Sequence, residues 1–277
     1  MKKYSVLFVL LFSLNSFLLT NACAESPKRI ISLAPSMTEI LFAMGLGDNI
    51  VGVASFSDYP AEAKKKPMVG GMKNPSLEAV ISLKPDIVIM TIDGNRQEFE
   101  ERLRSLKIKT YVFRAKRISE LPQGIRDLGA ALGQKEKAEA LAEHIGAGIR
   151  TISVKGVAAK KKNILFIIWP DPLLVAGPGS IADDAITLLG EQNIAKDGKI
   201  AYPKFSIEEV IRRSPDVIFI GKGAGMMDKL SQGLLERLNK VPAVRDKRVY
   251  YVGDYLYRLG PRTLKGVEEL ARYLDAR

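Results

Sequence analysis

The sequence predicts an α/β protein made of two similar lobes joined by one long helix, and three observations lead to this class. Short apolar runs alternate with segments of helical periodicity, which is typical of parallel sheets with crossover helices. The alternation stops at a long segment with a single apolar stripe, 135–152, and then begins again. Residues 76–90 also align without a gap on residues 206–220, with six identities in fifteen positions.

The predicted N-terminal lobe covers residues 25–132 and contains four strands. They are expected at 29–33, 50–54, 86–91 and 110–113. Helical spacing begins at Ser36 and stops at Gly45, and two further helices are expected over 95–106 and 118–132.

The predicted linking segment, 133–160, consists mainly of one helix. Its apolar stripe repeats at three- and four-residue steps and includes Ala138, Leu141, Ile145, Ile149 and Ile152. His144, the only histidine of the chain, lies beside this stripe and is interpreted as a surface or boundary residue of the helix. An alternative class, a secreted hydrolase, would have to use it as its base.

The predicted C-terminal lobe covers residues 161–277 and returns to alternating strands and helices. Strands are expected at 163–168, 217–220 and 249–252, and helices at 180–189 and 263–274. Trp169 precedes Pro170-Asp171-Pro172, a run that breaks helices, so the indole is expected on a loop at a strand end.

The internal repeat predicts the same local structure twice. In each copy a serine opens a helix, a proline ends it because proline cannot continue the hydrogen-bond ladder, and a buried strand follows. Glu78 and Glu208 fall in the first turn, where a negative charge is favoured by the helix dipole. Ser206 and Glu209 also have the spacing of a capping box.

The composition excludes several kinds of chemistry. With one Cys and one His in 277 residues, an intrachain disulfide is impossible and a Cys/His zinc site is nearly excluded. No catalytic residue, metal ligand or resident cofactor is predicted. One Trp and the lack of a recognisable binding motif argue against nucleic-acid binding. The basic charge leaves open a surface adhesion or scaffold protein as a third class.

The amino terminus predicts export. Lys2 and Lys3 precede an apolar run, 6–19, and Ala22-Cys23-Ala24 fits a cleavage site, so residues 1–24 are expected to be a signal peptide. Its removal lowers the formal charge from +11 to +9, and the exported chain is expected to be soluble. The alternative is a lipoprotein anchored at Cys23, although Thr20 stands where that pattern usually has Leu.

A set of short motifs in a fixed order resembles one family. They are Arg29–Glu39, Ser57–Pro60, Asn74–Glu78, Leu83–Asp86, Asp171-Pro172, Ala176-Gly177, Tyr202-Pro203, Ser206–Val210 and Gly260–Arg262. Together they are similar to the helical-backbone (class III) periplasmic binding proteins of ABC importers for cobalamin, iron-siderophores and haem, most of all to the cobalamin-binding members.

This resemblance implies a monomer that captures a ligand without catalysis. Two Rossmann-like lobes would hold a metal chelate in a cleft between them, and the long helix would limit closure. The expected cargo is a corrinoid such as cobalamin, delivered to an ABC permease, and the alternative is a ferric siderophore. Gly71 stands where haem binders of the family carry an axial Tyr, which argues against haem.

The resemblance also assigns residues. The cleft would be lined by Phe56, Met72, Trp169, Tyr202, Asp254, Tyr255 and Arg258. Met72 departs from the pattern, because cobalamin binders are expected to have Trp there. Glu78 and Glu208, one on each lobe, match the acids that dock onto arginines of the permease.

Overall fold

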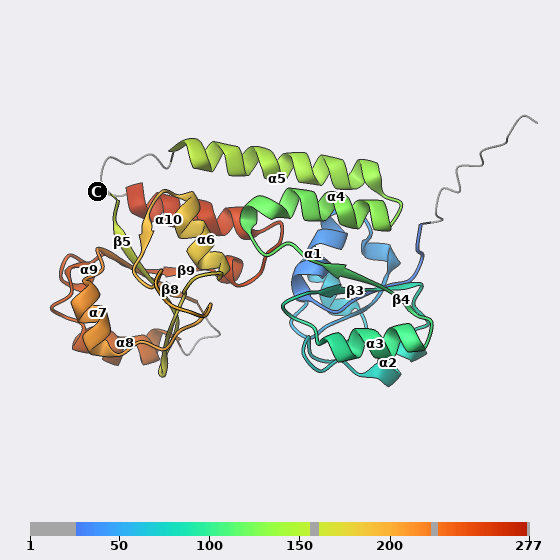
Figure 1. Cartoon of the computed structure of the whole chain (residues 1–277), viewed down its shortest axis with the longest axis horizontal. Coiled ribbons are helices and arrows are strands. Elements are labelled where there is room, and N and C mark those ends of the chain that lie inside the picture. The colour runs from blue at the N-terminus through green and yellow to red at the C-terminus, as the bar shows by residue number, and fades with distance from the viewer. Residues whose placement is uncertain (1–25, 156–160, 223–226, 276–277) are drawn as a thin grey trace, which may run out of the picture.

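The computed structural model describes residues 26–155, 161–222 and 227–275. The predicted signal peptide, with Cys23, lies outside the described residues, and so does most of the glycine-rich segment after Gly221. Two sheets lie side by side, each between two layers of helices, and α5 runs across both (Figure 1).

The N-terminal lobe, called the N-lobe below, contains a four-stranded parallel sheet in the order β2-β1-β3-β4. The strands are β1 (Ile30–Ser32), β2 (Ile50–Val53), β3 (Ile87–Thr91) and β4 (Lys109–Phe113). The helices are α1 (Pro35–Ala43), α2 (Leu77–Ser82), α3 (Gln97–Ser105) and α4 (Leu121–Ala131), with short 3-10 turns at Gly47–Asn49, Ala61–Lys65 and Ile118–Glu120. The helix expected over 118–132 is therefore a 3-10 turn followed by α4.

The C-terminal lobe, called the C-lobe, contains β5 (Asn163–Pro170), β6 (Leu173–Val175), β7 (Gln192–Asn193), β8 (Val217–Gly221) and β9 (Val249–Val252). Strands β7, β5, β8 and β9 are parallel, and β6 pairs antiparallel with the end of β5. The helices are α6 (Ile181–Leu188), α7 (Ile207–Arg213), α8 (Met227–Arg237), α9 (Pro242–Arg245) and α10 (Thr263–Asp275), with a 3-10 turn at Asp254–Tyr257.

The prediction that Trp169 lies on a loop is wrong. Strand β5 continues to Pro170 because β6 turns back along it, and Trp169 pairs with Leu174 inside this hairpin. Proline is tolerated at a strand end, where its missing N–H costs no ladder hydrogen bond.

The internal repeat has the same geometry in both lobes. The hydroxyls of Ser76 and Ser206 accept hydrogen bonds from the third residue of α2 and α7, at 3.2 and 3.1 Å. The capping-box prediction at α7 is only half met, because the Glu209 carboxylate turns to two arginines instead of back to Ser206.

After each repeated helix an aspartate anchors the neighbouring strand. Asp86 accepts from the backbone N–H groups of Lys28 and Arg29 just before β1, and Asp216 accepts from that of Asn163 at the start of β5. Both lobes thus use one carboxylate to hold two adjacent parallel strands in register.

The long helix α5 (Lys135–Lys155) covers a core that continues from one lobe to the other. Ile89 and Phe113 of the N-lobe sheet, Phe166 and Phe219 of the C-lobe sheet, and Ile145 of α5 belong to this one cluster. Smaller clusters fill the opposite face of each sheet. His144 is exposed on α5, as its position beside the stripe predicts. A shared core of close-packed side chains resists large rotation of the lobes.

Candidate functional site

The carboxyl ends of the parallel strands in the two lobes face each other. Residues that follow β2 and those that follow β9 form direct contacts, including Arg258 with Asp58 at 3.2 Å. In open α/β sheets ligands bind at this edge of the strands. Phe56, Trp169 and Asp254 all lie at such strand ends.

Phe56 is the most exposed large apolar side chain among the described residues, at 80%. Its backbone has φ 64°, a left-handed conformation that costs a residue other than glycine on the order of 1 kcal/mol. The next residue, Ser57, is buried, and its hydroxyl lies 3.2 Å from that of Thr38 on α1. Because Ser57 is held inside, the chain turns Phe56 outward at the edge of the sheet.

Met72 is held at the same edge by Asn95. The Asn95 amide donates to the carbonyl oxygens of Met72 at 2.7 Å and of Leu33 at 3.1 Å, and its oxygen accepts from the N–H of Thr91. One side chain thereby ties the Met72 loop to the ends of β1 and β3. Met72 is half-buried, with its thioether sulfur beside Gly94.

On the C-lobe, Trp169 is half-buried and its indole N–H donates to the carbonyl of Asp171 at 2.7 Å, which fixes the ring. Tyr202 is 44% exposed, and burial of its hydroxyl together with Asp93 of the N-lobe raises its pKa. Burial, Asp254 and Tyr202 raise the pKa of Tyr257 to about 12. Tyr202 is therefore close enough to the N-lobe for charges there to act on it.

Charged side chains connect the lobes. Glu39, Asp58 and Tyr59 of the N-lobe contact Arg258 and Arg262 of the C-lobe, and these five residues are called the interlobe clasp. Arg262 makes a two-pronged hydrogen bond to Glu39, at 2.6 and 3.0 Å, and Arg258 lies 3.7 Å from the same carboxylate. Glu39 is only 4% exposed.

Aromatic rings complete the clasp. The Arg262 guanidinium lies 4.4 Å from the ring centre of Tyr59 and 5.4 Å from that of Tyr255, so it sits against an aromatic residue from each lobe. Such cation–π contacts strengthen as water is removed. Hydrogen bonds to Glu39 also raise the pKa of Arg262, which keeps it charged.

Three residues assigned to ligand binding have partners within the protein. Arg258 pairs with Asp58 and lies 3.9 Å from Asp254, while Tyr255 packs toward α10 at Gly266. Tyr255 also lines a cavity of about 850 Å³ between α5 and α10. The structure thus brings Phe56 and Met72 to the N-lobe edge and Trp169 and Tyr202 to the C-lobe, and turns Tyr255 toward α10.

The sequence did not predict that Glu39, Tyr59 and Arg262 contact one another across the lobes, although each lies inside a motif quoted above. A charged residue in the middle of the apolar helix α1 was the available signal, because a buried carboxylate requires a cationic partner.

Glu78 and Glu208 are exposed in the first turns of α2 and α7, on the layer of each lobe away from α5 (Figure 1). Hydrogen bonds to its own backbone and to Ser206, together with the charge of Arg237, lower the pKa of Glu208. Glu208 also borders a hollow of about 490 Å³ between α7, α8 and the β5–β6 hairpin. Both carboxylates are available to a partner outside the chain.

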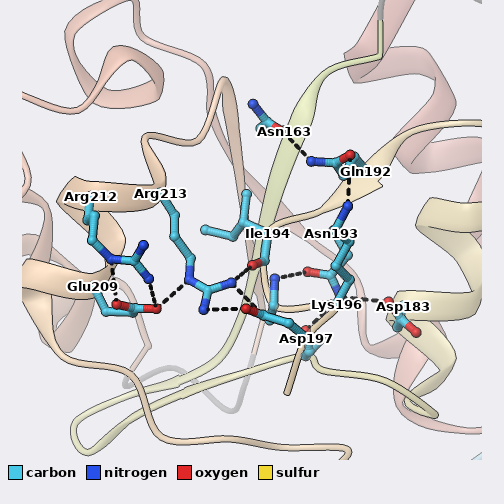
Figure 2. A network of polar contacts seen from close by, with 12 residues as sticks. Asn163, Asp183, Gln192, Asn193, Ile194, Lys196, Asp197, Glu209, Arg212 and Arg213 are labelled. Carbon is cyan, nitrogen blue, oxygen red and sulfur yellow. Dashed lines mark hydrogen bonds and ion pairs between the residues drawn. The ribbon is translucent and has the colours of Figure 1, made fainter. Parts of the chain in front are cut away.

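A polar network surrounds the end of α7 (Figure 2). Arg213 donates to Glu209 on its own helix, to both oxygens of Asp197 and to the carbonyl of Ile194. Asn193 continues the network toward Asp183. Asp197 lies on the segment between β7 and α7 that also carries Tyr202, so the network ties this segment to the helix of Glu208.

Neither a metal-binding cluster nor a membrane-spanning helix is present among the described residues. No group of three or more His, Cys, Asp or Glu side chains in the described ranges is arranged to hold a metal ion. Within those same ranges, no helix has the length and hydropathy to span a membrane.

Two α/β lobes on a long helix, with exposed and half-buried aromatic residues at facing sheet edges, define a two-lobed binding protein. A family model described as "Periplasmic binding protein" matches residues 30–256, and the chain belongs to this family. It is a non-enzymatic substrate-binding protein of ABC import, and the family implies a permease partner and a small-molecule ligand.

The most similar relatives include proteins described as binding vitamin B12 and proteins described as binding heme. The chain is 30% identical over 267 residues to a vitamin B12-binding protein of Pectobacterium carotovorum, covering 95% of this chain and 94% of the relative. The structure of the periplasmic vitamin B12 binding protein BtuF of Vibrio cholerae superposes on this chain with a TM-score of 0.80 at 28% sequence identity. The match covers 90% of this chain and 97% of BtuF. The apo structure of the periplasmic heme-binding protein RhuT from Roseiflexus sp. RS-1 superposes with a TM-score of 0.81 at 30% sequence identity. This match covers 89% of this chain and 97% of RhuT.

Proposed function

We propose that this protein captures a corrinoid such as cobalamin in the periplasm and delivers it to an ABC permease. The observation that carries the proposal is the set of aromatic residues at the facing sheet edges, Phe56, Trp169 and Tyr202. Flat rings supply a large contact area at little cost in conformational entropy, which suits a large macrocycle. The vitamin B12-binding relatives support the same ligand class.

Phe56 is the strongest single candidate. A phenyl ring that is 80% exposed gains nothing from the fold, and the left-handed backbone beneath it costs free energy. The exposed ring and the left-handed backbone are both unfavourable in the free protein, and binding of a ligand over the ring would offset them. Trp169 and Tyr202 would supply the opposing face from the C-lobe, and Met72 the floor between them.

In the proposed transport cycle, Glu78 and Glu208 dock onto cationic side chains of the permease. They occupy equivalent positions on the two lobes, and both carboxylates are exposed. The proposal assigns the clasp residue Arg258, with Asp254, to the rim of the ligand site, and Tyr255 to supporting α10 behind it.

Isothermal calorimetry of the purified chain with cyanocobalamin tests the ligand. Binding with a Kd below about 10 µM is expected, equivalent to roughly −7 kcal/mol, and Phe56→Ala should weaken it at least tenfold. Leu106→Ala, which removes another exposed apolar side chain far along the N-lobe, is the matched control.

The same titration with a ferric siderophore and with haemin separates the alternatives. Tight binding of a ferric chelate without corrinoid binding would replace cobalamin by a siderophore. Tight haemin binding would show that Gly71 does not exclude haem.

A further inference from the structure

The six residues that are identical in the two copies of the repeat differ in what they do. Four pairs have a role inside their own lobe. Ser76 and Ser206 cap the helices, Val80 and Val210 are fully buried, Pro85 and Pro215 end the helical segments, and Asp86 and Asp216 anchor β1 and β5. The remaining two pairs are Glu78 with Glu208 and Ile81 with Ile211. Their side chains are exposed in both lobes.

The isoleucines are the unexpected pair. Ile81 is 42% exposed and Ile211 is 44% exposed, so the same apolar side chain is presented to the same degree on both lobes. A β-branched residue on an exposed helix position has a lower helix propensity than Ala or Leu and gains little from packing. Packing within each lobe therefore leaves a large part of each isoleucine uncovered.

Their position relative to the glutamates is fixed by helix geometry. Ile81 follows Glu78 by three residues on α2, and Ile211 follows Glu208 by three residues on α7. Side chains at this spacing lie next to each other on one helix face. Each lobe thus presents one carboxylate beside one apolar side chain, and the two patches are related by the internal repeat.

We propose that Ile81 and Ile211 are apolar contacts of the permease interface, one beside each docking glutamate. This rests on the proposed function and names further residues of the same surface. An exposed ion pair by itself contributes little because water screens it, whereas a neighbouring apolar contact that excludes water strengthens it.

The partner surface follows from this pairing. It carries two equivalent sites, each with a guanidinium group for the carboxylate and an apolar depression for the isoleucine. Arginine suits such a site because its planar fork bonds a carboxylate with two parallel hydrogen bonds and it tolerates partial burial. Two matching patches on the binding protein fit a permease whose two halves present like surfaces.

Binding of the ligand-free chain to the ABC permease of its own host in nanodiscs, measured by biolayer interferometry, tests the inference. Ile81→Lys and Ile211→Lys should each weaken docking about tenfold and the double variant about a hundredfold, because distant sites add. The conservative variants Ile81→Leu and Ile211→Leu should dock nearly as the unchanged chain does. Leu106→Lys, at 49% exposure at the end of α3, is the matched control and should dock normally.

Cyanocobalamin titration of the same variants separates the two proposals. The isoleucine variants should bind ligand as the unchanged chain does, and their circular dichroism should be unaltered. Normal docking of the double isoleucine variant, with docking lost in Glu78→Lys/Glu208→Lys, would overturn the isoleucine inference alone. Normal docking of both double variants would overturn the proposed docking surface itself.

Discussion

Helices α2 and α7 occupy equivalent places in the two lobes, but their last turns are held by different contacts. At the end of α2, Leu83 packs into the N-lobe core, and Arg29 donates to the Leu83 carbonyl at 2.6 Å. At the end of α7 the position of Leu83 is taken by Arg213, which bonds Glu209, Asp197 and Ile194 (Figure 2).

The difference shows that one backbone motif can be fastened by packing or by polar contacts. In the N-lobe the helix is tied to the strand β1. In the C-lobe it is tied to the segment that carries Tyr202, so the docking helix and a candidate ligand residue share one network. The experiments below test how far the two lobes are equivalent and how strongly they are joined.

The largest effect on stability is expected at the clasp, where the lobes meet. Glu39→Ala removes the buried carboxylate that pairs with Arg262, and leaves this partly buried guanidinium without its main partner, while Arg258 keeps Asp58 at 3.2 Å. The free energy of unfolding should fall by about 3 kcal/mol, measured by urea denaturation. Glu62→Ala, an exposed acid of the same lobe, should change it very little, and a fall below about 1 kcal/mol in Glu39→Ala would contradict a clasp that stabilises the pair of lobes.

The next largest loss of stability is expected when Arg213 at the end of α7 is replaced by leucine, the residue at the equivalent N-lobe position, Leu83. Arg213→Leu removes the bonds to Asp197 and to the Ile194 carbonyl, and the carbonyl loses its charged donor. We expect a loss of about 2 kcal/mol in unfolding free energy. Arg212→Ser, the equivalent exchange at a side chain that is 67% exposed, should be nearly neutral. Equal effects of the two substitutions would show that Arg213 is no more important than a surface arginine.

Gly221 lies one residue beyond the fifteen aligned positions of the repeat. Its N-lobe equivalent is Thr91, but a Cβ at Gly221 would lie 1.7 Å from the Tyr257 hydroxyl oxygen, which has no hydrogen-bond partner among the described residues. Gly221→Ala should therefore cost about 1.5 kcal/mol by overpacking, measured by thermal unfolding. Adding Tyr257→Phe should recover only part of this loss, because the ring carbon Cζ of residue 257 would still lie 2.5 Å from the new Cβ. An additive cost in the double variant would show that the hydroxyl is not the obstacle.

The smallest effect should be equal in both lobes. Ser76→Ala and Ser206→Ala each remove one capping hydrogen bond, and each should lower the unfolding free energy by about 1 kcal/mol, measured by urea denaturation. Ser119→Ala, at an exposed position of a 3-10 turn, is the control. A clearly larger loss at Ser206 would mean that its hydroxyl also matters through Glu208.

Much of the fold could be predicted because its causes are local. Apolar periodicity placed β3, α5 and α10 within a few residues of their bounds, and proline with its preceding helix marked both copies of the repeat. Trp169 was misplaced because strand β5 is extended by β6, which is a contact that the local sequence does not specify. At the site, the exposure of Phe56 follows from burial of its neighbour Ser57 against α1, which only the folded chain shows.

The sequence by itself determined the two-lobed α/β class, the long helix and the equivalence of Glu78 with Glu208. Only the tertiary structure decided that Glu39 meets Arg262, 223 residues away, and that Asp58 meets Arg258, 200 residues away. It also decided that Ile81 and Ile211 are exposed to the same degree. Helix and strand patterns depend on neighbours a few residues apart, whereas a buried ion pair and an exposed side chain depend on which surfaces meet when both lobes have folded.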